Sequence, residues 1–236
     1  MSTPGSHPGP AQTGPVEERV EPDAACVLFV CTGNVCRSVI AEAIFQARAD
    51  IQAWPVRADS AGLTGEGARP PRHAAAVMRR RGIDISRHRS RRLTGPMIDE
   101  AALVLGSCPE HVWAAAVLRP DASGRIFTIK ELVRLGDRTG RPAPHELLES
   151  WIERVAASRQ PEDADTTRHD TIDDPKGKRR QTYERVTLEV ERLVLHLTDL
   201  MTPAMIARTP SPASGPRRAR THETTPINPR HGGRAR

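Results

Sequence analysis

Residues 25–42, ACVLFVCTGNVCRSVIAE, decide the fold of this chain. The apolar run Cys26–Val30 is typical of a buried parallel strand, and Val39–Arg48 places its apolar residues at helical spacing. Between these two elements, Cys31 and Arg37 stand on either side of a tight strand-to-helix turn. A Cys-x5-Arg spacing arises easily by chance in an arginine-rich chain. The prediction therefore rests on the order of strand, loop and helix around these two residues.

The loop itself suits an anion. Successive backbone N–H groups in a turn, followed by the positive end of a helix, form a concavity that binds phosphate. Gly33 and Asn34 both tolerate the positive φ that such a turn needs. Arg37 can donate two hydrogen bonds to phosphate oxygens, and Ser38 can donate one to a Cys31 thiolate, a form that the helix end and the arginine favour. The loop therefore predicts a covalent phosphate site with Cys31 as nucleophile; an inert buried thiol is the alternative.

Strands and helices alternate along the rest of the chain. Further strands are predicted at Val56–Ser60, Ala101–Leu105 and Arg125–Ile129, and helices at Pro71–Arg81, Pro109–Leu118, Lys130–Leu135, His145–Ala157 and Arg179–Leu200. The polar stretch Arg159–Thr171 is predicted to be a loop. Repeated strand–helix units predict an α/β fold with a central four-stranded parallel sheet and helices on both faces, a Rossmann-like arrangement of three layers. Ligands bind beyond the carboxyl ends of such strands, where Cys31 lies.

The two ends of the chain differ from its middle. Residues 1–23 contain five prolines and few large apolar side chains, so they are predicted to be a disordered tail. Residues 203–236 are rich in Pro and Arg and are predicted to be a second disordered tail, leaving residues 24–202 as the folded domain. The tail at 203–236 holds seven Arg and one Glu, whereas residues 1–202 hold 28 basic and 28 acidic residues. The net positive charge thus belongs to the tail, which disfavours nucleic acid as a partner and leaves a solvated tail or a weak contact with an acidic partner.

Composition also bounds the location and the cofactors. No run reaches the roughly 18 apolar residues of a membrane span, and the N-terminus does not resemble a signal peptide, so a cytoplasmic location is expected. Four cysteines without a Cys-x2-Cys pair favour neither a disulfide framework nor a zinc site. We expect no metal and no cofactor.

The loop Val30–Ser38 resembles the phosphate-binding loop of the bacterial low-molecular-weight protein-tyrosine phosphatases. The resemblance continues, in order, through Ser60-Ala61-Gly62, Gly82–Asp84 with His88–Arg91, the strand Ala101–Leu105, and Asp174-Pro175. It covers roughly residues 25–200, with an enlarged segment at 136–172. It implies that phosphate is bound by Thr32, Gly33, Asn34, Val35, Cys36, Arg37 and Ser38, with Asn34, Ser38 and Ser60 supporting the loop.

The resemblance also implies a mechanism. Pro175 biases Asp174 towards extended backbone, and the aspartate of this Asp-Pro pair is the family's general acid and later its general base. Cys31 would attack phosphorus to form a cysteinyl-phosphate while Arg37 holds the oxygens, without any metal. Asp173 is predicted to be a bystander; an ordinary loop or helix-start role is the alternative for both aspartates.

Predictions can also be made for a second cysteine of the loop, Cys36, and for two histidines, His88 and His111. Cys36 lies within the loop, where relatives protect the nucleophile by a reversible disulfide, here with Cys31; a space-filling thiol is the alternative. His88 and His111 are predicted to be structural or surface histidines, since the mechanism leaves them no role.

The chain departs from the family pattern at the substrate. Lys176 and Gly177 follow the Asp-Pro pair where relatives usually have aromatic residues, and Leu63–Pro70 has no aromatic residue either. This leaves the preference for aryl phosphates open; Lys176 is either a solvated lysine or a contact for an acidic peptide.

The sequence predicts a protein-tyrosine phosphatase acting on phosphorylated proteins or peptides. One alternative is an arsenate reductase using an external thiol, since Cys108 is the only downstream cysteine. Another is a protein-arginine phosphatase, although such relatives carry Thr where this chain has Val35. The last is an inactive module that only binds anions.

Overall fold

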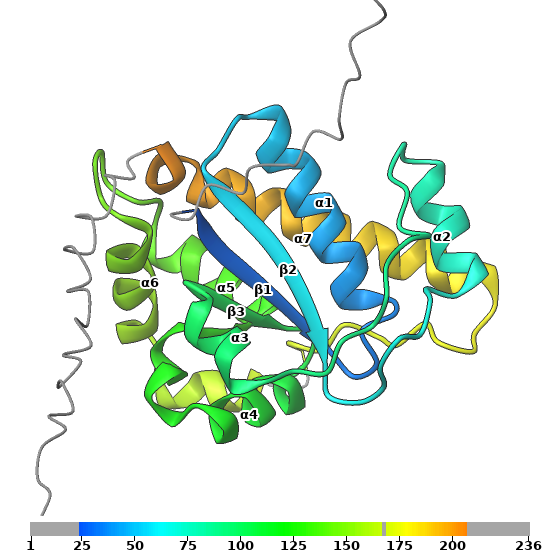
Figure 1. Cartoon of the computed structure of the whole chain (residues 1–236). Coiled ribbons are helices and arrows are strands. Elements are labelled where there is room, and N and C mark those ends of the chain that lie inside the picture. Colours follow the sequence, from blue (N-terminus) through cyan, green and yellow to red (C-terminus); the bar gives the residue numbers. More distant parts are fainter. Residues whose placement is uncertain (1–23, 167–168, 207–236) are drawn as a thin grey trace, which may run out of the picture.

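The computed structural model describes residues 24–166 and 169–206. Its centre is a four-stranded parallel sheet with the strand order β2-β1-β3-β4 (Figure 1). The strands are β1 (Ala25–Cys31), β2 (Val56–Gly62), β3 (Leu103–Gly106) and β4 (Ile126–Thr128). The predicted parallel sheet is confirmed, with strand ends shifted by one or two residues. The tails predicted at 1–23 and over most of 203–236 lie outside the described residues.

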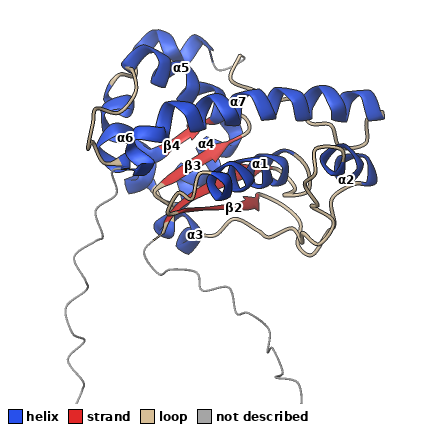
Figure 2. Ribbon diagram, turned by 90° about the horizontal axis from the view of Figure 1, so that it is seen from above, coloured by secondary structure: helices blue, strands red, loops and turns tan. Residues whose placement is uncertain are grey.

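Helices cover both faces of the sheet, as predicted (Figure 2). The helices are α1 (Arg37–Ile51), α2 (Arg72–Arg79), α3 (Gly95–Glu100), α4 (Pro109–Leu118), α5 (Ile129–Thr139), α6 (Leu148–Ala157) and α7 (Arg180–Ile206). Every residue of β1 is buried, and its side chains alternate between two cores. Val27 and Phe29 pack with α1, α5 and α7, whereas Leu28 and Val30 pack with α3 and α4.

The differences from the predicted elements have local causes. The helix predicted at His145–Ala157 begins only at Leu148, because His145 has a positive φ of 69° and follows Pro144. Three short elements escaped prediction because six residues are too few to show a period: α3 and the 3-10 helices η1 (Pro120–Arg125) and η2 (Pro161–Thr166). The last of these lies inside the predicted loop 159–171.

Helix α7 is the longest element and packs against α1, α2, α5 and α6. It continues to Ile206, beyond residue 202, where the sequence places the end of the domain. Within the two described ranges, no helix has both the length and the apolar character that crossing a membrane requires. The loops that follow β1, β2 and β3 meet the segment before α7 at the carboxyl edge of the sheet, and this edge holds the candidate site.

Candidate active site

The phosphate loop connects the last residue of β1, Cys31, to the first residue of α1, Arg37. Asn34 adopts a positive φ of 48°, as its residue type allows, and its own N–H points at the Cys31 sulfur. The chain after β2 runs beside the loop, with the Leu63 N–H donating to the Cys31 carbonyl (3.1 Å) and the Thr64 N–H to the Thr32 carbonyl (2.8 Å). The start of the loop is therefore tied to the segment that follows β2.

The sulfur of Cys31 is surrounded by donors. The Asn34 N–H donates to Cys31 Sγ (3.2 Å), and the Ser38 hydroxyl lies 3.0 Å from the same atom. Ser38 Oγ also accepts a hydrogen bond from Asn34 Nδ2 (3.0 Å), so the hydroxyl proton is free to point at the sulfur. The Asn34 N–H and the Ser38 hydroxyl therefore both lie within hydrogen-bond distance of the Cys31 sulfur.

Asn34 organises the loop through its buried side chain. Its Nδ2 also donates to Ser60 Oγ (2.8 Å), a contact that suits a residue supporting the loop. Its Oδ1 accepts from the Arg91 N–H (2.8 Å), so the residues after α2 are tied to the loop as well. Ser60 in turn donates to the Glu42 carboxylate, and burial raises the pKa of Glu42. Glu42 is a member of this network that the sequence did not indicate.

Arg37 joins the phosphate loop to the segment that carries Asp174. Its Nη2 donates to Thr32 Oγ1 (3.1 Å) and to Asp174 Oδ2 (2.9 Å), and its Nη1 donates to the Ile172 carbonyl (3.2 Å). The other Asp174 oxygen accepts from the Lys176 N–H (3.0 Å). Arg37 Nε is buried without a hydrogen-bond partner among the described residues, so this donor is available to an oxyanion. The three predicted catalytic residues thus meet at one edge of the sheet.

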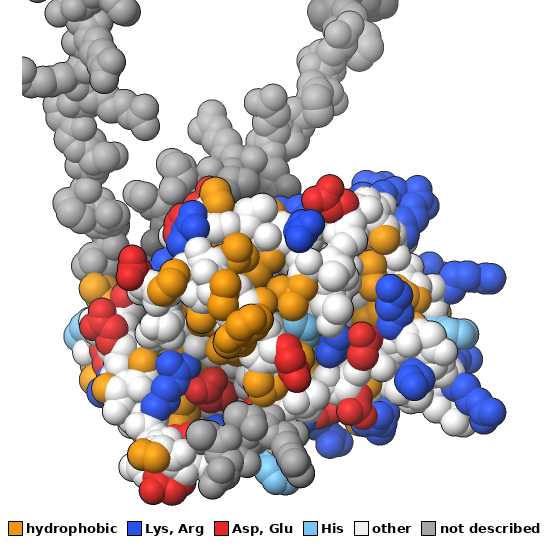
Figure 3. All heavy atoms as spheres, turned by 90° about the horizontal axis from the view of Figure 1, so that it is seen from below, with side chains coloured by type: hydrophobic (Ala, Val, Ile, Leu, Met, Phe, Trp, Pro, Cys, Tyr) orange, Lys and Arg blue, Asp and Glu red, His pale blue; other side chains and the backbone are white. Residues whose placement is uncertain are grey.

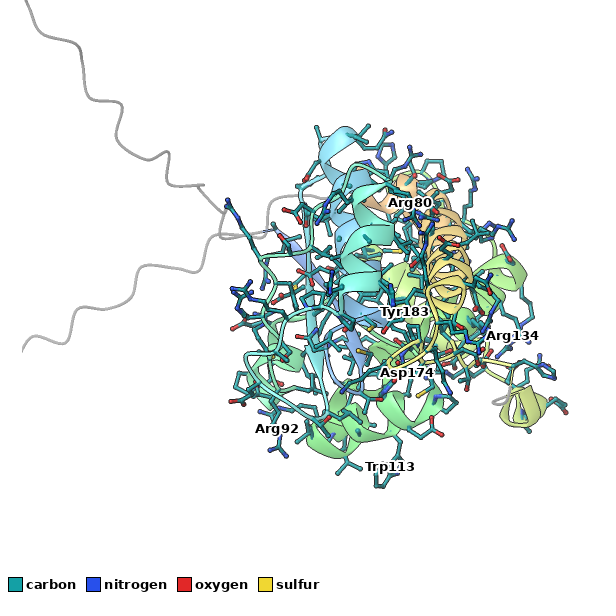
Figure 4. The ribbon with its side chains drawn as sticks, turned by 90° about the vertical axis from the view of Figure 1, so that its right-hand side faces the viewer. Arg80, Arg92, Trp113, Arg134, Asp174 and Tyr183 are labelled. Carbon is teal, nitrogen blue, oxygen red and sulfur yellow. The ribbon has the colours of Figure 1, made fainter. Side chains whose placement is uncertain are left out.

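The segment before Asp174 is fixed by contacts that the sequence did not predict. The Ile172 N–H donates to the Ser107 carbonyl at the end of β3 (2.8 Å). Further back, the buried carboxylate of Asp170 accepts from Arg134 of α5 (3.0 Å). In the view of Figure 4, Asp174 lies between the labelled Tyr183 of α7 and Trp113 of α4. The sheet and α5 together therefore determine where the carboxylate of Asp174 stands.

Thr32 connects the site to a buried pair on α4. Its hydroxyl lies 3.1 Å from His111 Nε2, while His111 Nδ1 lies 3.2 Å from Cys108 Sγ. Burial, and then the nearby Arg37, lower the pKa of His111 to about 4, so the imidazole is neutral near pH 7. The structural role predicted for His111 is confirmed, whereas a surface position is wrong, because only 1% of it is exposed.

Two further side chains near the site, Asp173 and His88, have defined partners. Asp173 pairs with Arg185 of α7 (2.7 Å), as expected of a bystander. His88 is structural: its Nε2 lies 2.9 Å from the Asn34 carbonyl, and burial lowers its pKa.

Cys36 is a second thiol of the loop, but its environment differs. Burial, and then the Asp174 carboxylate, raise the pKa of Cys36 to about 12, so its sulfur stays protonated near pH 7. Among the described residues, all four cysteines are free thiols. A reversible disulfide between Cys36 and Cys31 stays a prediction.

The edge of the phosphate loop, at Gly33, lies close to one cation, the ammonium group of Lys176. A Cβ atom built on Gly33 would lie 4.0 Å from Lys176 Nζ, and one built on Gly65 would lie 4.0 Å from the Gly33 carbonyl oxygen. Neither residues 63–70 nor residues 175–182 include an aromatic side chain. No three His, Cys, Asp or Glu side chains in the described ranges gather into a group that could hold a metal ion.

Comparisons with known proteins agree with this geometry. The family model described as low molecular weight phosphotyrosine protein phosphatase matches residues 26–157, which include the phosphate loop but not Asp174. A protein-arginine-phosphatase of Geobacillus stearothermophilus is 35% identical over 147 residues, covering 58% of the chain and 97% of that relative. A probable low molecular weight protein-tyrosine-phosphatase, EpsP, of Ralstonia nicotianae is 36% identical over 146 residues, covering 56% and 96%.

Solved structures give the same assignment. The low molecular weight protein tyrosine phosphatase from T. tengcongensis superposes with a TM-score of 0.56 at 29% identity, covering 75% of the chain and 99% of that protein. Both the relatives and the family model describe phosphate-ester or phosphoarginine hydrolases. This chain belongs to the low-molecular-weight protein-tyrosine phosphatase family.

Proposed function

We propose that this chain hydrolyses phosphotyrosine in proteins through a cysteinyl-phosphate, with Cys31 as nucleophile, Arg37 as phosphate clamp and Asp174 as general acid and base. The observation that carries the proposal is the double contact of Arg37. One guanidinium group donates both to Thr32 of the loop and to the Asp174 carboxylate, so it brings the anion site and the acid together.

In the first step, the Cys31 thiolate attacks phosphorus in line and the ester P–O bond breaks. The Arg37 guanidinium and the loop N–H groups hold the equatorial oxygens, whose charge they stabilise throughout. Asp174 in its protonated form donates its proton to the departing oxygen, so that the tyrosine leaves as a neutral phenol.

In the second step, a water molecule attacks the phosphorus of the cysteinyl-phosphate. Asp174, now a carboxylate, takes a proton from that water, and the S–P bond breaks to restore the Cys31 thiolate and release phosphate. The half-exposed side chain of Asp174 suits both roles, because it reaches substrate and solvent.

The test is hydrolysis of p-nitrophenyl phosphate and of a phosphotyrosine peptide by the wild type, Cys31→Ser and Asp174→Asn. Cys31→Ser should have no measurable turnover, and wild-type-like activity in this variant would refute the mechanism. Asp174→Asn should slow the first step most for a poor leaving group. An unchanged rate on phenyl phosphate would assign the acid to another residue. Any cysteine-dependent hydrolysis excludes the inactive anion-binding module.

Protein-arginine phosphatase is the second candidate, because several similar proteins carry that name. The family resemblance implies Thr in arginine phosphatases at the loop position where this chain has Val35, which favours an ester substrate. Side-by-side kcat/KM values on phosphotyrosine and phosphoarginine peptides separate the two. Thiol-dependent arsenate reduction is measured in the same experiment to test the arsenate reductase alternative.

We further propose a cytoplasmic location, and a weak contact between the basic residues 203–236 and an acidic partner. Cell fractionation tests the first, and the salt dependence of binding by a chain truncated after Ile206 tests the second.

A further inference from the structure

Lys176 occupies the rim of the phosphate loop. Its Nζ stands 4.0 Å from where a Cβ of Gly33 would lie, and its backbone N–H is fixed by the Asp174 carboxylate. Its ammonium group forms no ion pair with any residue that the structure describes, although it acts to lower the pKa of the nearby Cys36. A cation without a carboxylate partner among the described residues therefore stands beside the phosphate loop, where the phosphorylated side chain of a substrate would bind.

The surface on the α2 side of the loop is also basic. Residues 63–92 contain nine Arg and only two acidic residues, although residues 1–202 are balanced overall. His88 and Arg91 of this segment contact Asn34 in the loop, so the arginine-rich stretch lies directly against the site. Figure 3 shows the face seen from below, with Lys and Arg side chains gathered on its right, the side of α2 in Figure 1. A substrate that approaches the loop from this side meets positive charge.

We infer that Lys176 determines substrate specificity: it favours phosphotyrosine flanked by acidic residues and disfavours phosphoarginine. The inference rests on the proposed function and names the substrate class of the same site. A carboxylate next to the phosphorylated residue gains an attractive partner in Lys176, with the arginine-rich surface adding longer-range attraction. The guanidinium group of phosphoarginine is cationic, so the same lysine repels it at the point where it enters the loop.

The size of the effect follows from the exposure of Lys176. An exposed ion pair changes affinity by roughly 1.5- to 5-fold, and it weakens with salt because exposed charges are screened. Lys176→Met should therefore lower the preference for an acidic over a neutral flank by roughly 1.5- to 5-fold. Lys176→Glu should reverse the preference between acidic and basic flanks.

The experiment measures kcat/KM on three phosphotyrosine peptides that differ only in carrying Glu, Gln or Lys on both sides of the phosphotyrosine, and on a matched phosphoarginine peptide. Wild type, Lys176→Met, Lys176→Glu and Lys176→Arg are compared at low and high salt. Lys178→Met is the matched control, because it removes the same charge two residues away while the backbone turn to Pro175 remains. Lys176→Arg and Lys178→Met should keep the wild-type ratios, and Lys176→Met should raise relative activity on phosphoarginine.

Equal ratios in the wild type and Lys176→Met, or an equal loss in Lys178→Met, would overturn the inference. Hydrolysis of p-nitrophenyl phosphate by the same variants distinguishes a failure of the inference about Lys176 from a failure of the proposed function. If the wild type hydrolyses it in a Cys31-dependent manner while the flank ratios do not respond to Lys176, only the inference fails. If this hydrolysis is missing or survives in Cys31→Ser, the proposed function fails and the inference with it.

Discussion

The buried Asn34 side chain makes three hydrogen bonds, so Asn34→Ala tests how the phosphate loop is held. It removes the donations to Ser38 (3.0 Å) and Ser60 (2.8 Å) and the acceptance from Arg91 (2.8 Å). Each bond contributes about 1 kcal/mol, and alanine at a positive φ costs about 1 kcal/mol more. We expect the free energy of unfolding to fall by about 3–4 kcal/mol, a large share of the roughly 5–15 kcal/mol typical of a domain.

The loss should not exceed this sum, because two of the abandoned partners keep other contacts. Ser60 still donates to Glu42, and Ser38 still lies beside Cys31. Only the Arg91 N–H loses the partner that holds it.

Urea unfolding followed by circular dichroism measures the change, together with kcat/KM on p-nitrophenyl phosphate. Asn34→Gly is the control, because glycine adopts positive φ freely and should be about 0.5–1 kcal/mol less destabilising than alanine. A loss below about 1 kcal/mol in Asn34→Ala would refute the view that these three bonds hold the loop.

Three further predictions test the surroundings of the loop. In Gly62→Ala the new Cβ would lie 2.7 Å from the Asn34 backbone nitrogen, so Tm and kcat/KM should both fall, whereas Gly124→Ala, with no atom within 4 Å, should change neither. The buried His111 binds its proton only near pH 4, against about 6.5 when unfolded, so the unfolded chain takes up more protons between these values. Stability should therefore fall by roughly 2–3 kcal/mol as pH drops from about 6.5 to about 4, and urea unfolding of His111→Gln should show a flatter pH profile. Asp170→Asn loosens the segment before Asp174 and should lower kcat several-fold more on phenyl phosphate than on p-nitrophenyl phosphate; equal losses on both would remove its role in positioning the acid.

Features that depend on neighbouring residues could be predicted from the sequence. The strand, turn and helix around Cys31 and Arg37 are fixed by local apolar spacing and by residue types that tolerate the turn. The bounds of helix Pro109–Leu118 were predicted without error, since Pro109 begins it and Pro120 follows its end. The position of Asp174 beside Arg37 also agrees with the Asp-Pro motif.

Features that depend on packing between distant segments could not be predicted. The Ile172 carbonyl that fixes Arg37, and the contact of His111 with Thr32, exist only because loops from different strands meet at one edge of the sheet. The charge count over the sequence also did not predict how charge is distributed on the folded surface. Counting charges over residues 1–202 gives a neutral body, but folding places the arginine-rich residues 63–92 on one side of the site.

The pairing of Arg37 with Asp174 joins groups 137 residues apart, and this has a consequence for biosynthesis. At about 5–20 residues per second, a ribosome makes the second group about 7–27 s after the first. Helix α1 also lacks its partner α7 until residues 180–206 have emerged. A nascent chain therefore carries Cys31 and Arg37 long before it contains Asp174 and α7, so the proposed site can form only after residues 174–206 have emerged.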